Sequence, residues 1–273
     1  MNLHELTNIT DTFDHTALMP VLFVGHGNPM NAIANNAFTQ RLASWGNNFT
    51  EKPKAILVIS AHWLTHGTHV MISPKPKTIH DFGGFPEALY NIQYPAPGSP
   101  ELASQAKALV TSTNVISDDQ WGLDHGAWTV LRHMFPKADV PVFQLSIDFS
   151  MSPQYHYNLA EELKSLRKKG VLIIGSGNIV HNLYQIEFNE NAEPYDWAVE
   201  FDEIVKTELE KNNYDNLINY SSLGKSAGLS VPTNDHYLPM LYSLGLANEN
   251  ESLKFTYEEI QNASISMRCF QIG

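Results

Sequence analysis

Short, almost uninterrupted apolar segments rich in β-branched residues recur along the 273-residue chain and alternate with segments of helical periodicity. Strands with this composition are buried on both faces, as in parallel sheets covered by helices. The alternation predicts an α/β fold with a mostly parallel or mixed central sheet flanked by helices. The expected strands are Val21–Val24, Ala55–Ser60, Asn114–Ser117, Pro141–Ile147 and Val171–Gly175. The expected helices are Ala34–Trp45, Glu101–Thr111, Trp128–Phe135, Pro153–Lys169 and Ile179–Ile186.

The last third of the chain has a different pattern, in which two helical segments precede two strand-like ones. Helices are expected over Glu193–Asn212 and Tyr237–Leu244, and strands over Lys254–Glu259 and Ser264–Gln271. We expect the late strands to form an antiparallel edge of the sheet. No repeat, low-complexity tract or linker composition divides the chain. The sequence therefore predicts one domain over residues 16–273, preceded by a polar lead-in over residues 1–15.

The charge balance excludes some classes of partner. With 17 Lys and Arg against 29 Asp and Glu, the net charge is 17 − 29 = −12 at pH 7, whereas nucleic-acid binding depends on cations that neutralise phosphates. An anionic membrane surface is disfavoured for the same reason. No apolar run reaches the roughly 20 residues of a membrane-spanning helix, and the N-terminus lacks the pattern of a secretory signal. Cys269 is the single cysteine, which excludes an internal disulfide. We therefore expect a cytoplasmic protein with neither nucleic acid nor membrane as a partner.

Histidines follow the predicted strands at equivalent places. In an open α/β sheet, ligands bind beyond the carboxyl ends of the strands, and five of the 12 histidines are expected near that edge. They are His26 after the first strand, His62 after the second, His125 in a glycine-containing loop, His181 in the first helical turn after the fifth strand, and His236 at the start of a late helix. A random scatter would place several of these histidines in mid-helix.

Imidazole is a common ligand of Zn, Fe, Ni and Cu. His26 and His62, together with His236 and His181, could provide a site of three or four nitrogens. Their spacing matches no short zinc motif such as His-Glu-x-x-His. From topology alone, a metal site and ordinary hydrogen-bonded histidines remain equally compatible with the pattern.

The segment 73–100 combines six of the 15 prolines with three glycines and four aromatic residues. A connection of this length without periodicity inside a compact domain is usually functional or disordered. Its aromatic residues argue against disorder. We expect the segment to lie over the histidines and to form part of a ligand pocket.

Six motifs, in this order along the chain, support a family assignment. They are Gly-His-Gly-Asn-Pro-Met at 25–30, Ser-Ala-His-Trp at 60–63, His-Asp-Phe-Gly-Gly-Phe-Pro at 80–86, Gly-Leu-Asp-His-Gly-Ala-Trp at 122–128, Gly-Ser-Gly-Asn-Ile-Val-His-Asn at 175–182 and Asp-His-Tyr-Leu-Pro at 235–239. From about Met19 onward the sequence resembles the 4,5-DOPA extradiol dioxygenases. These belong to the class III aromatic ring-opening dioxygenases, which include the catalytic subunit of protocatechuate 4,5-dioxygenase.

The resemblance implies a single α/β domain around one non-haem divalent metal. The family's metal-binding histidines map onto His26, His62 and His236. His181 matches a histidine that acts as an acid or base in the wider class and can also face the metal, and His125 matches a further active-site histidine. The wider class uses two histidines and a glutamate, whereas the third position here is His236. We expect Fe(II) for dioxygenase activity, and three neutral imidazoles also suit Zn(II).

The resemblance further implies cleavage of a DOPA-like catechol by O₂ to a muconic-semialdehyde type product. His125 and His181 are the expected acid–base residues, with Asp124 a candidate for orienting His125. His80, Phe82 and Tyr94, from the segment 73–100, are the expected substrate contacts. Two alternatives stay open: a zinc hydrolase that uses a metal-bound water, and a zinc-binding protein without catalytic activity.

Overall fold

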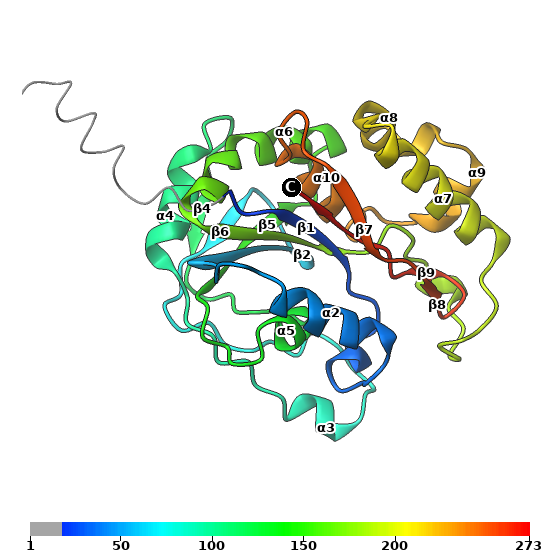
Figure 1. Ribbon diagram of the computed structural model, residues 1–273, viewed down its shortest axis with the longest axis horizontal. Helices are drawn as coiled ribbons and strands as arrows, with labels where there is room; N and C mark the ends of the chain where they lie inside the picture. Colours follow the sequence, from blue (N-terminus) through cyan, green and yellow to red (C-terminus); the bar gives the residue numbers. More distant parts are fainter. Residues whose placement is uncertain (1–17) are drawn as a thin grey trace, which may run out of the picture.

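The computed structural model describes residues 18–273, so the predicted lead-in over residues 1–15 lies outside the described part. Its centre is an eight-stranded mixed sheet with the strand order β4-β3-β5-β2-β6-β1-β10-β7 (Figure 1). The strands are β1 Val21–Gly25, β2 Ala55–Thr65, β3 His69–Met71, β4 Ile116–Asp118, β5 Val142–Asp148, β6 Val171–Gly177, β7 Leu253–Tyr257 and β10 Cys269–Ile272. A second, two-stranded sheet pairs β8 Ile260–Gln261 with β9 Ile265–Ser266.

Helical segments connect the strands. The α-helices are α2 Ala37–Asn47, α3 Glu87–Tyr90, α4 Pro100–Leu109, α5 His125–Met134, α6 Pro153–Glu162, α7 Asp196–Glu210, α8 Tyr214–Ile218, α9 Lys225–Ser230 and α10 Leu238–Gly245. The 3₁₀ turns are η1 Pro29–Ala32, η2 Lys164–Lys169, η3 Leu183–Gln185 and η4 Tyr220–Ser222. Within residues 18–273, none of these helices is long and apolar enough to cross a membrane.

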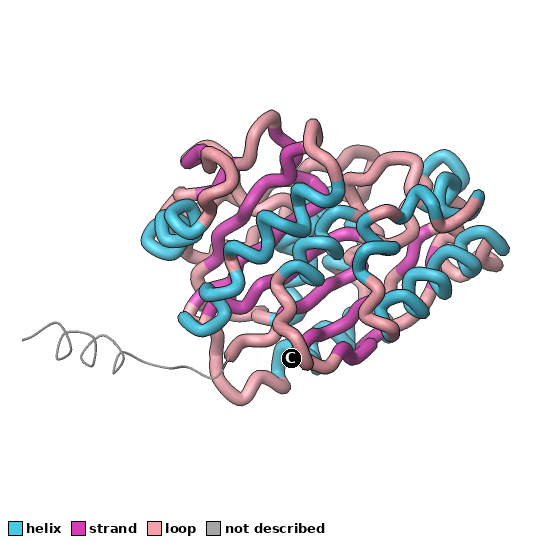
Figure 2. Tube along the Cα trace, turned by 90° about the horizontal axis from the view of Figure 1, so that it is seen from above, coloured by secondary structure: helices cyan, strands magenta, loops and turns pink. Residues whose placement is uncertain are grey.

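The layers follow from the burial of the strands. β5, β2, β6 and β1 run parallel side by side, and β1, β2, β5 and β6 are buried along almost their whole length. Helices α2 and α5 cover one face of the sheet, and α6 and α10 cover the other (Figure 1). Figure 2 shows the helices lying across the strands when the molecule is seen from above. Every residue of α10 is buried, which is the pattern of a helix enclosed on all sides. The predicted fold class is confirmed.

The late strands also take their predicted role. β10 pairs antiparallel with β1, and β7 pairs antiparallel with β10 and forms the edge of the sheet. The segment predicted as one strand over Ser264–Gln271 is divided into β9 and β10. The strand β3 and the helices α8 and α9 were not expected from the sequence, because each is too short to show a clear periodicity.

Two predicted elements near the histidines differ in the structure. The helix expected over Ile179–Ile186 is wrong, and only the 3₁₀ turn η3 forms there. The backbone N–H groups of this segment bind distant carbonyls instead of forming helical bonds: His181 donates to Ser230 O at 2.9 Å and Asn182 to Ser264 O at 3.3 Å. The second strand continues past its predicted end, with an irregularity between Ile59 and Leu64, so His62 lies within β2.

Candidate metal centre

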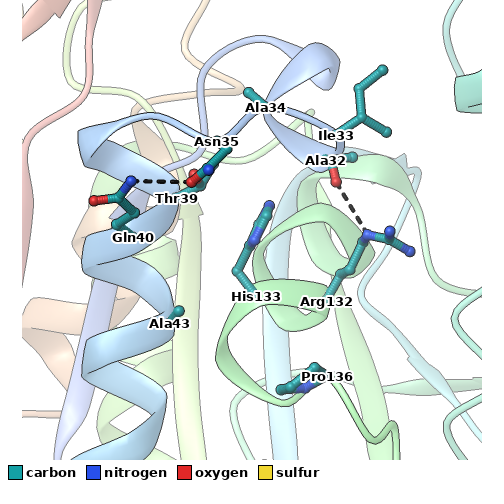
Figure 3. Close-up of a pocket in the computed structure, with 10 residues that line it drawn as sticks. All are labelled: Ala32, Ile33, Ala34, Asn35, Thr39, Gln40, Ala43, Arg132, His133 and Pro136. Atoms are coloured by element: carbon teal, nitrogen blue, oxygen red, sulfur yellow. Dashed lines mark hydrogen bonds between the residues drawn. The ribbon is translucent and has the colours of Figure 1, made fainter.

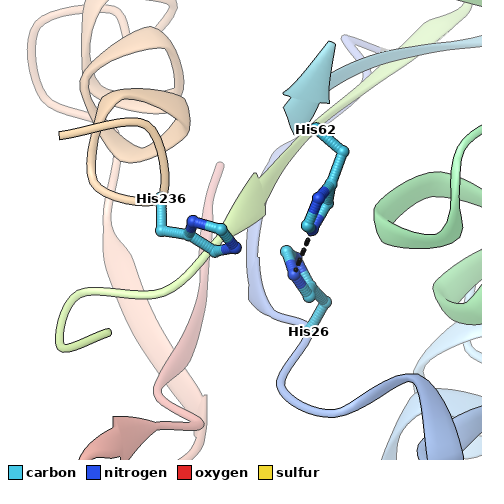
Figure 4. Close-up of side chains that lie close together, drawn as sticks. All are labelled: His26, His62 and His236. Carbon is cyan, nitrogen blue, oxygen red and sulfur yellow. Dashed lines mark hydrogen bonds between the residues drawn. The ribbon is translucent and has the colours of Figure 1, made fainter. Parts of the chain in front are cut away.

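Three histidines from separate elements point toward one another (Figure 4). His26 follows β1, His62 lies in β2, and His236 lies just before α10. The Nε2 atoms of His26 and His62 are 3.1 Å apart. One ligand atom from each of the three residues can be chosen so that all lie within 4.8 Å of one another. Three imidazole nitrogens at this spacing can surround one metal ion.

The other ring nitrogen of each histidine faces an oxygen. Ser176 Oγ donates to Gly126 O at 2.6 Å, so it is an acceptor for His26 Nδ1–H at 3.0 Å. His236 Nδ1 is hydrogen-bonded to Asp235. These contacts place the proton on Nδ1 and leave Nε2 with a free lone pair. Metal-ligating histidines usually have an outer acceptor of this kind, which sets the tautomer and the ring orientation.

The Nδ1 atom of His62, the third histidine, lies near Asp81. The distance from His62 Nδ1 to Asp81 Oδ2 is 3.4 Å, so this Nδ1 also faces a carboxylate. The donor set is therefore three Nε2 atoms with outward-facing Nδ1–H groups, which fits a divalent transition metal such as Fe(II) or Zn(II).

Glycines allow the surrounding backbone to approach the site. A Cβ on Gly126 would lie 2.9 Å from the His62 ring and 2.5 Å from Ser60 Oγ. A Cβ on Gly177, at the end of β6, would lie 2.1 Å from the carbonyl oxygen of His236. Any side chain at either position would displace a histidine of the site.

The site favours neutral imidazoles. Burial, followed by the charges of neighbouring histidines, holds the pKa of His26 and of His62 well below the ordinary value. The same causes lower the pKa of His181, although Asp235 partly opposes them. Neutral rings keep the lone pairs that a metal requires.

His181 and His125 flank the three converging histidines. The ring of His181 is stacked on that of His236, with 3.5 Å between centroids and 6° between planes. An isolated bridge to Ile265 holds the backbone of His181. The ring centroids of His125 and His62 are 3.8 Å apart. All five predicted histidines are thus brought together. Besides the His26–His62–His236 group, His125 forms a possible metal-binding group with His62 and Asp81, and His181 forms one with Asp235 and His236.

Asp81 orients His125, a role that the sequence analysis gave to Asp124. Asp81 Oδ1 accepts the backbone N–H of His125, and Asp81 Oδ2 lies 2.9 Å from His125 Nδ1. Burial raises the pKa of Asp81, but its hydrogen bonds with His125 and the charge of that histidine lower it more. Asp124 is instead the N-cap of α5 and accepts a hydrogen bond from Ser60 Oγ at 2.6 Å. The sequence offered one indication of this role: Asp81 follows His80 directly, in a motif that contains two predicted site residues.

The histidines form the floor of a cavity of about 280 Å³. Its outer wall is mainly apolar and comes from loop residues together with the short turn η3 and the short strand β9. The wall side chains are Phe82, Phe85, Leu183, Ile186 and Ile265, with Asn28 and Asn262 as polar neighbours. A planar aromatic ligand is suited to a cavity that combines an imidazole floor with an apolar wall.

The segment 73–100 reaches this cavity with only part of its aromatic residues. Phe82 lines the cavity, and its ring centroid is 5.5 Å from that of His125. His80 and Tyr94 are not among the lining residues. His80 Nε2 is hydrogen-bonded to Ile92 O at 3.0 Å, and the buried Tyr94 donates its O–H to Phe135 O at 2.9 Å. These two side chains anchor the segment to itself and to the core.

A larger hollow of about 490 Å³ lies between η1, α2 and α5 (Figure 3). Arg132 Nε donates to Ala32 O at 3.1 Å, and His133 Nε2 is bonded to Asn31 O at 2.7 Å. Asn31 Nδ2 in turn donates to the carbonyl of His26 at 3.3 Å. The polar groups of this hollow thus support the loop that carries His26.

Comparison with known proteins agrees with this geometry. Residues 15–268 match the family model described as the catalytic LigB subunit of aromatic ring-opening dioxygenase. The chain is 43% identical over 270 residues to a 4,5-DOPA dioxygenase extradiol of Escherichia coli K12, covering 97% of this chain and 98% of the relative. The chain therefore belongs to the ring-opening dioxygenase family. It is an oxidoreductase of the ring-cleaving class, as the resemblance implied.

Two further proteins are similar to this chain over nearly the same length. A 4,5-DOPA dioxygenase extradiol of Beta vulgaris is 38% identical and covers 92% of this chain and 91% of its own length. The crystal structure of an uncharacterized protein from Escherichia coli K12 superposes with a TM-score of 0.82 at 40% identity, covering 93% of this chain and 100% of that chain. The similarity extends over nearly the whole described domain.

Proposed function

We propose that this dioxygenase cleaves the ring of a catechol beside the diol, using one divalent metal held by His26, His62 and His236. The observation that carries the proposal is the convergence of three imidazole ligands at the floor of a cavity with an apolar wall. Bound Fe(II) would supply neighbouring positions at which both catechol oxygens and O₂ can bind. The expected product is a muconic-semialdehyde type compound.

The wall positions the substrate. Phe82 and Phe85 meet edge to face, with 5.3 Å between their ring centroids. A catechol ring bound over the histidine floor can pack against Phe82 in the same way. The apolar side chains of Leu183 and Ile186 line the same cavity. With the catechol bound they would exclude water from the ring, which strengthens the electrostatic interactions inside the cavity.

His125 and His181 move protons in this proposal. Asp81 occupies Nδ1 of His125, so Nε2 is the nitrogen that accepts a proton from a catechol hydroxyl. A neutral imidazole near the substrate is suited to take this proton and to return one later in the reaction. His181 is stacked on His236, and with Asp235 and His236 it also forms a group close enough to hold a metal ion. We assign it an acid–base role, with a fourth metal bond as the alternative.

The names of two relatives point to DOPA as a substrate, and we propose a DOPA-like catechol for this chain. A zinc hydrolase is less well supported, because it would usually need a carboxylate free to act as a base. Asp81 and Asp235 both face imidazole N–H groups. Asp124 is fully buried, accepts a hydrogen bond from Ser60 and is not among the residues that line the cavity. A closed structural zinc site would require a fourth ligand.

Anaerobic reconstitution with Fe(II) tests the proposal. Addition of L-DOPA and O₂ to the reconstituted protein should give O₂ uptake in a one-to-one ratio with a yellow ring-cleaved product. Zinc-loaded protein at equal occupancy is the control and should bind the catechol without O₂ uptake. Stoichiometric Fe(II) binding with no turnover of any of several catechols would contradict the proposal.

A further inference from the structure

We infer that Asp81 is a positioning residue that fixes the tautomer of His125, so that the proton acceptor in the cavity is Nε2. The inference rests on the proposed role of His125 and adds the device that makes that role possible. It depends on the hydrogen bonds of one carboxylate, because both of its oxygens are used by the same histidine residue.

The geometry leaves one arrangement of protons. Asp81 Oδ1 accepts the backbone N–H of His125 at 2.9 Å, which fixes the carboxylate relative to the first turn of α5. Asp81 Oδ2 then lies 2.9 Å from Nδ1 of the same residue. An ionised carboxylate can only accept, so Nδ1 carries a proton, and in the neutral imidazole Nε2 is then the basic nitrogen.

The same carboxylate faces a metal ligand. Asp81 Oδ2 is 3.4 Å from Nδ1 of His62, and the Asp81 side chain is only 19% exposed. One residue therefore helps to direct a lone pair of His62 toward the metal and a lone pair of His125 toward the substrate. Partners of this kind typically change metal affinity by roughly 10- to 100-fold when they are removed.

Asp81 also links the proton acceptor to the cavity wall. It directly precedes Phe82, which lines the cavity. A displacement of this part of the segment 73–100 would thus move the wall and release His125 together. The segment 73–100 therefore does more than cover the histidines, because it contains Asp81, which determines the nitrogen of His125 that carries the proton.

The substitution Asp81→Asn keeps the shape of the side chain but removes its negative charge and changes the tautomer of His125 that it can bind. If the amide oxygen keeps the backbone N–H of His125, the amide NH₂ faces Nδ1 and can only donate. Nδ1 must then lose its proton and Nε2 must gain it, which leaves His125 without an acceptor that faces the cavity. An analogous change of tautomer abolishes most of the activity of catalytic triads. We expect kcat to fall by about 10²- to 10⁴-fold at saturating Fe(II), with the KM for catechol changed by less than about threefold.

Nitrogen-15 NMR of the zinc-loaded protein gives a measurement that does not depend on turnover. The wild-type spectrum should show His125 protonated at Nδ1, and Asp81→Asn should show it protonated at Nε2. Asp81→Glu keeps two acceptor oxygens and should restore the Nδ1–H form together with at least a tenth of the wild-type kcat. Catechol binding to the zinc-loaded variants should be retained.

Asp118→Asn is the matched control. Asp118 Oδ2 lies 3.5 Å from Nδ1 of His69, and neither residue lines the cavity. This variant should leave the His125 tautomer and kcat unchanged. The inference is overturned if Asp81→Asn keeps His125 in the Nδ1–H form, or if the tautomer changes without loss of kcat. Absence of catechol binding to the zinc-loaded wild-type protein would contradict the proposed function itself.

Discussion

The floor and the outer wall of the cavity are built in different ways. The three proposed ligand histidines of the floor lie just after β1, within β2 and just before the buried helix α10, and each has its second nitrogen beside an oxygen. The wall comes from loop residues, the short turn η3 and the short strand β9, and most of its apolar side chains are partly open to solvent, with Leu183 57% exposed. The groups with the most fixed partners are thus those to which we assign metal binding and proton transfer. In the proposed function, the floor determines the reaction and the wall determines which substrate is accepted.

Removal of a floor ligand should have the largest effect. In His62→Ala only two ligands of the proposed set remain, so we expect metal affinity to fall more than about 100-fold and turnover to disappear. The fold should persist, because β2 keeps its buried pairing with β5 and β6. Metal content by mass spectrometry and circular dichroism measure the two effects. His69→Ala is the control outside the cavity, and full metal occupancy in His62→Ala would refute the ligand assignment.

Loss of a proton-transfer group should affect the rate but leave the metal in place. His125→Ala is expected to retain metal and catechol binding while kcat falls by about 10²- to 10⁴-fold. Steady-state kinetics at measured metal occupancy checks this prediction. If turnover is unchanged, His125 has no part in the mechanism. For His181→Ala, loss of metal as well as activity would show that it is a fourth ligand.

The wall should affect substrate binding by a smaller factor. Phe82→Ala removes an aromatic contact worth about 1 kcal/mol, so the KM for catechol should rise about five- to tenfold with metal content unchanged. Tyr94→Phe, in the same segment, removes only the hydrogen bond to Phe135 and should leave the KM as in the wild type. Equal KM values in Phe82→Ala and the wild type would contradict a substrate contact at the wall.

The difference between the histidine floor and the outer wall also explains which parts of the site could be predicted from the sequence. The central strands, and His26 and His62 near their ends, could be predicted because apolar runs lead directly into these histidines, and this pattern is local. The roles of His125 and His236, which lie in a loop and at a helix start, came from the family resemblance. Asp81 was missed because its role depends on a loop folding over the start of α5. Tyr94 was expected in the pocket from composition alone, but its ring is buried in the core. The helix expected near His181 failed because its N–H groups find distant partners. Contacts between remote loops leave no periodic signal.

The last prediction, with the smallest expected effect, concerns how the charge of the cavity wall distinguishes between charged and neutral catechols. Among residues 18–273, the side chains that line the cavity include no Lys or Arg and one carboxylate, Asp81, and residues 1–17 contain no Lys or Arg either. A carboxylate on the substrate therefore has no cationic partner at the wall. Compared with 4-propylcatechol, 3-(3,4-dihydroxyphenyl)propionate should bind zinc-loaded protein about fivefold more weakly, which corresponds to about 1 kcal/mol of unfavourable charge interaction. L-DOPA should lie between them, because its ammonium group offsets its carboxylate. Competition binding at constant ionic strength measures all three, and tighter binding of the propionate would show that the wall does not select for charge.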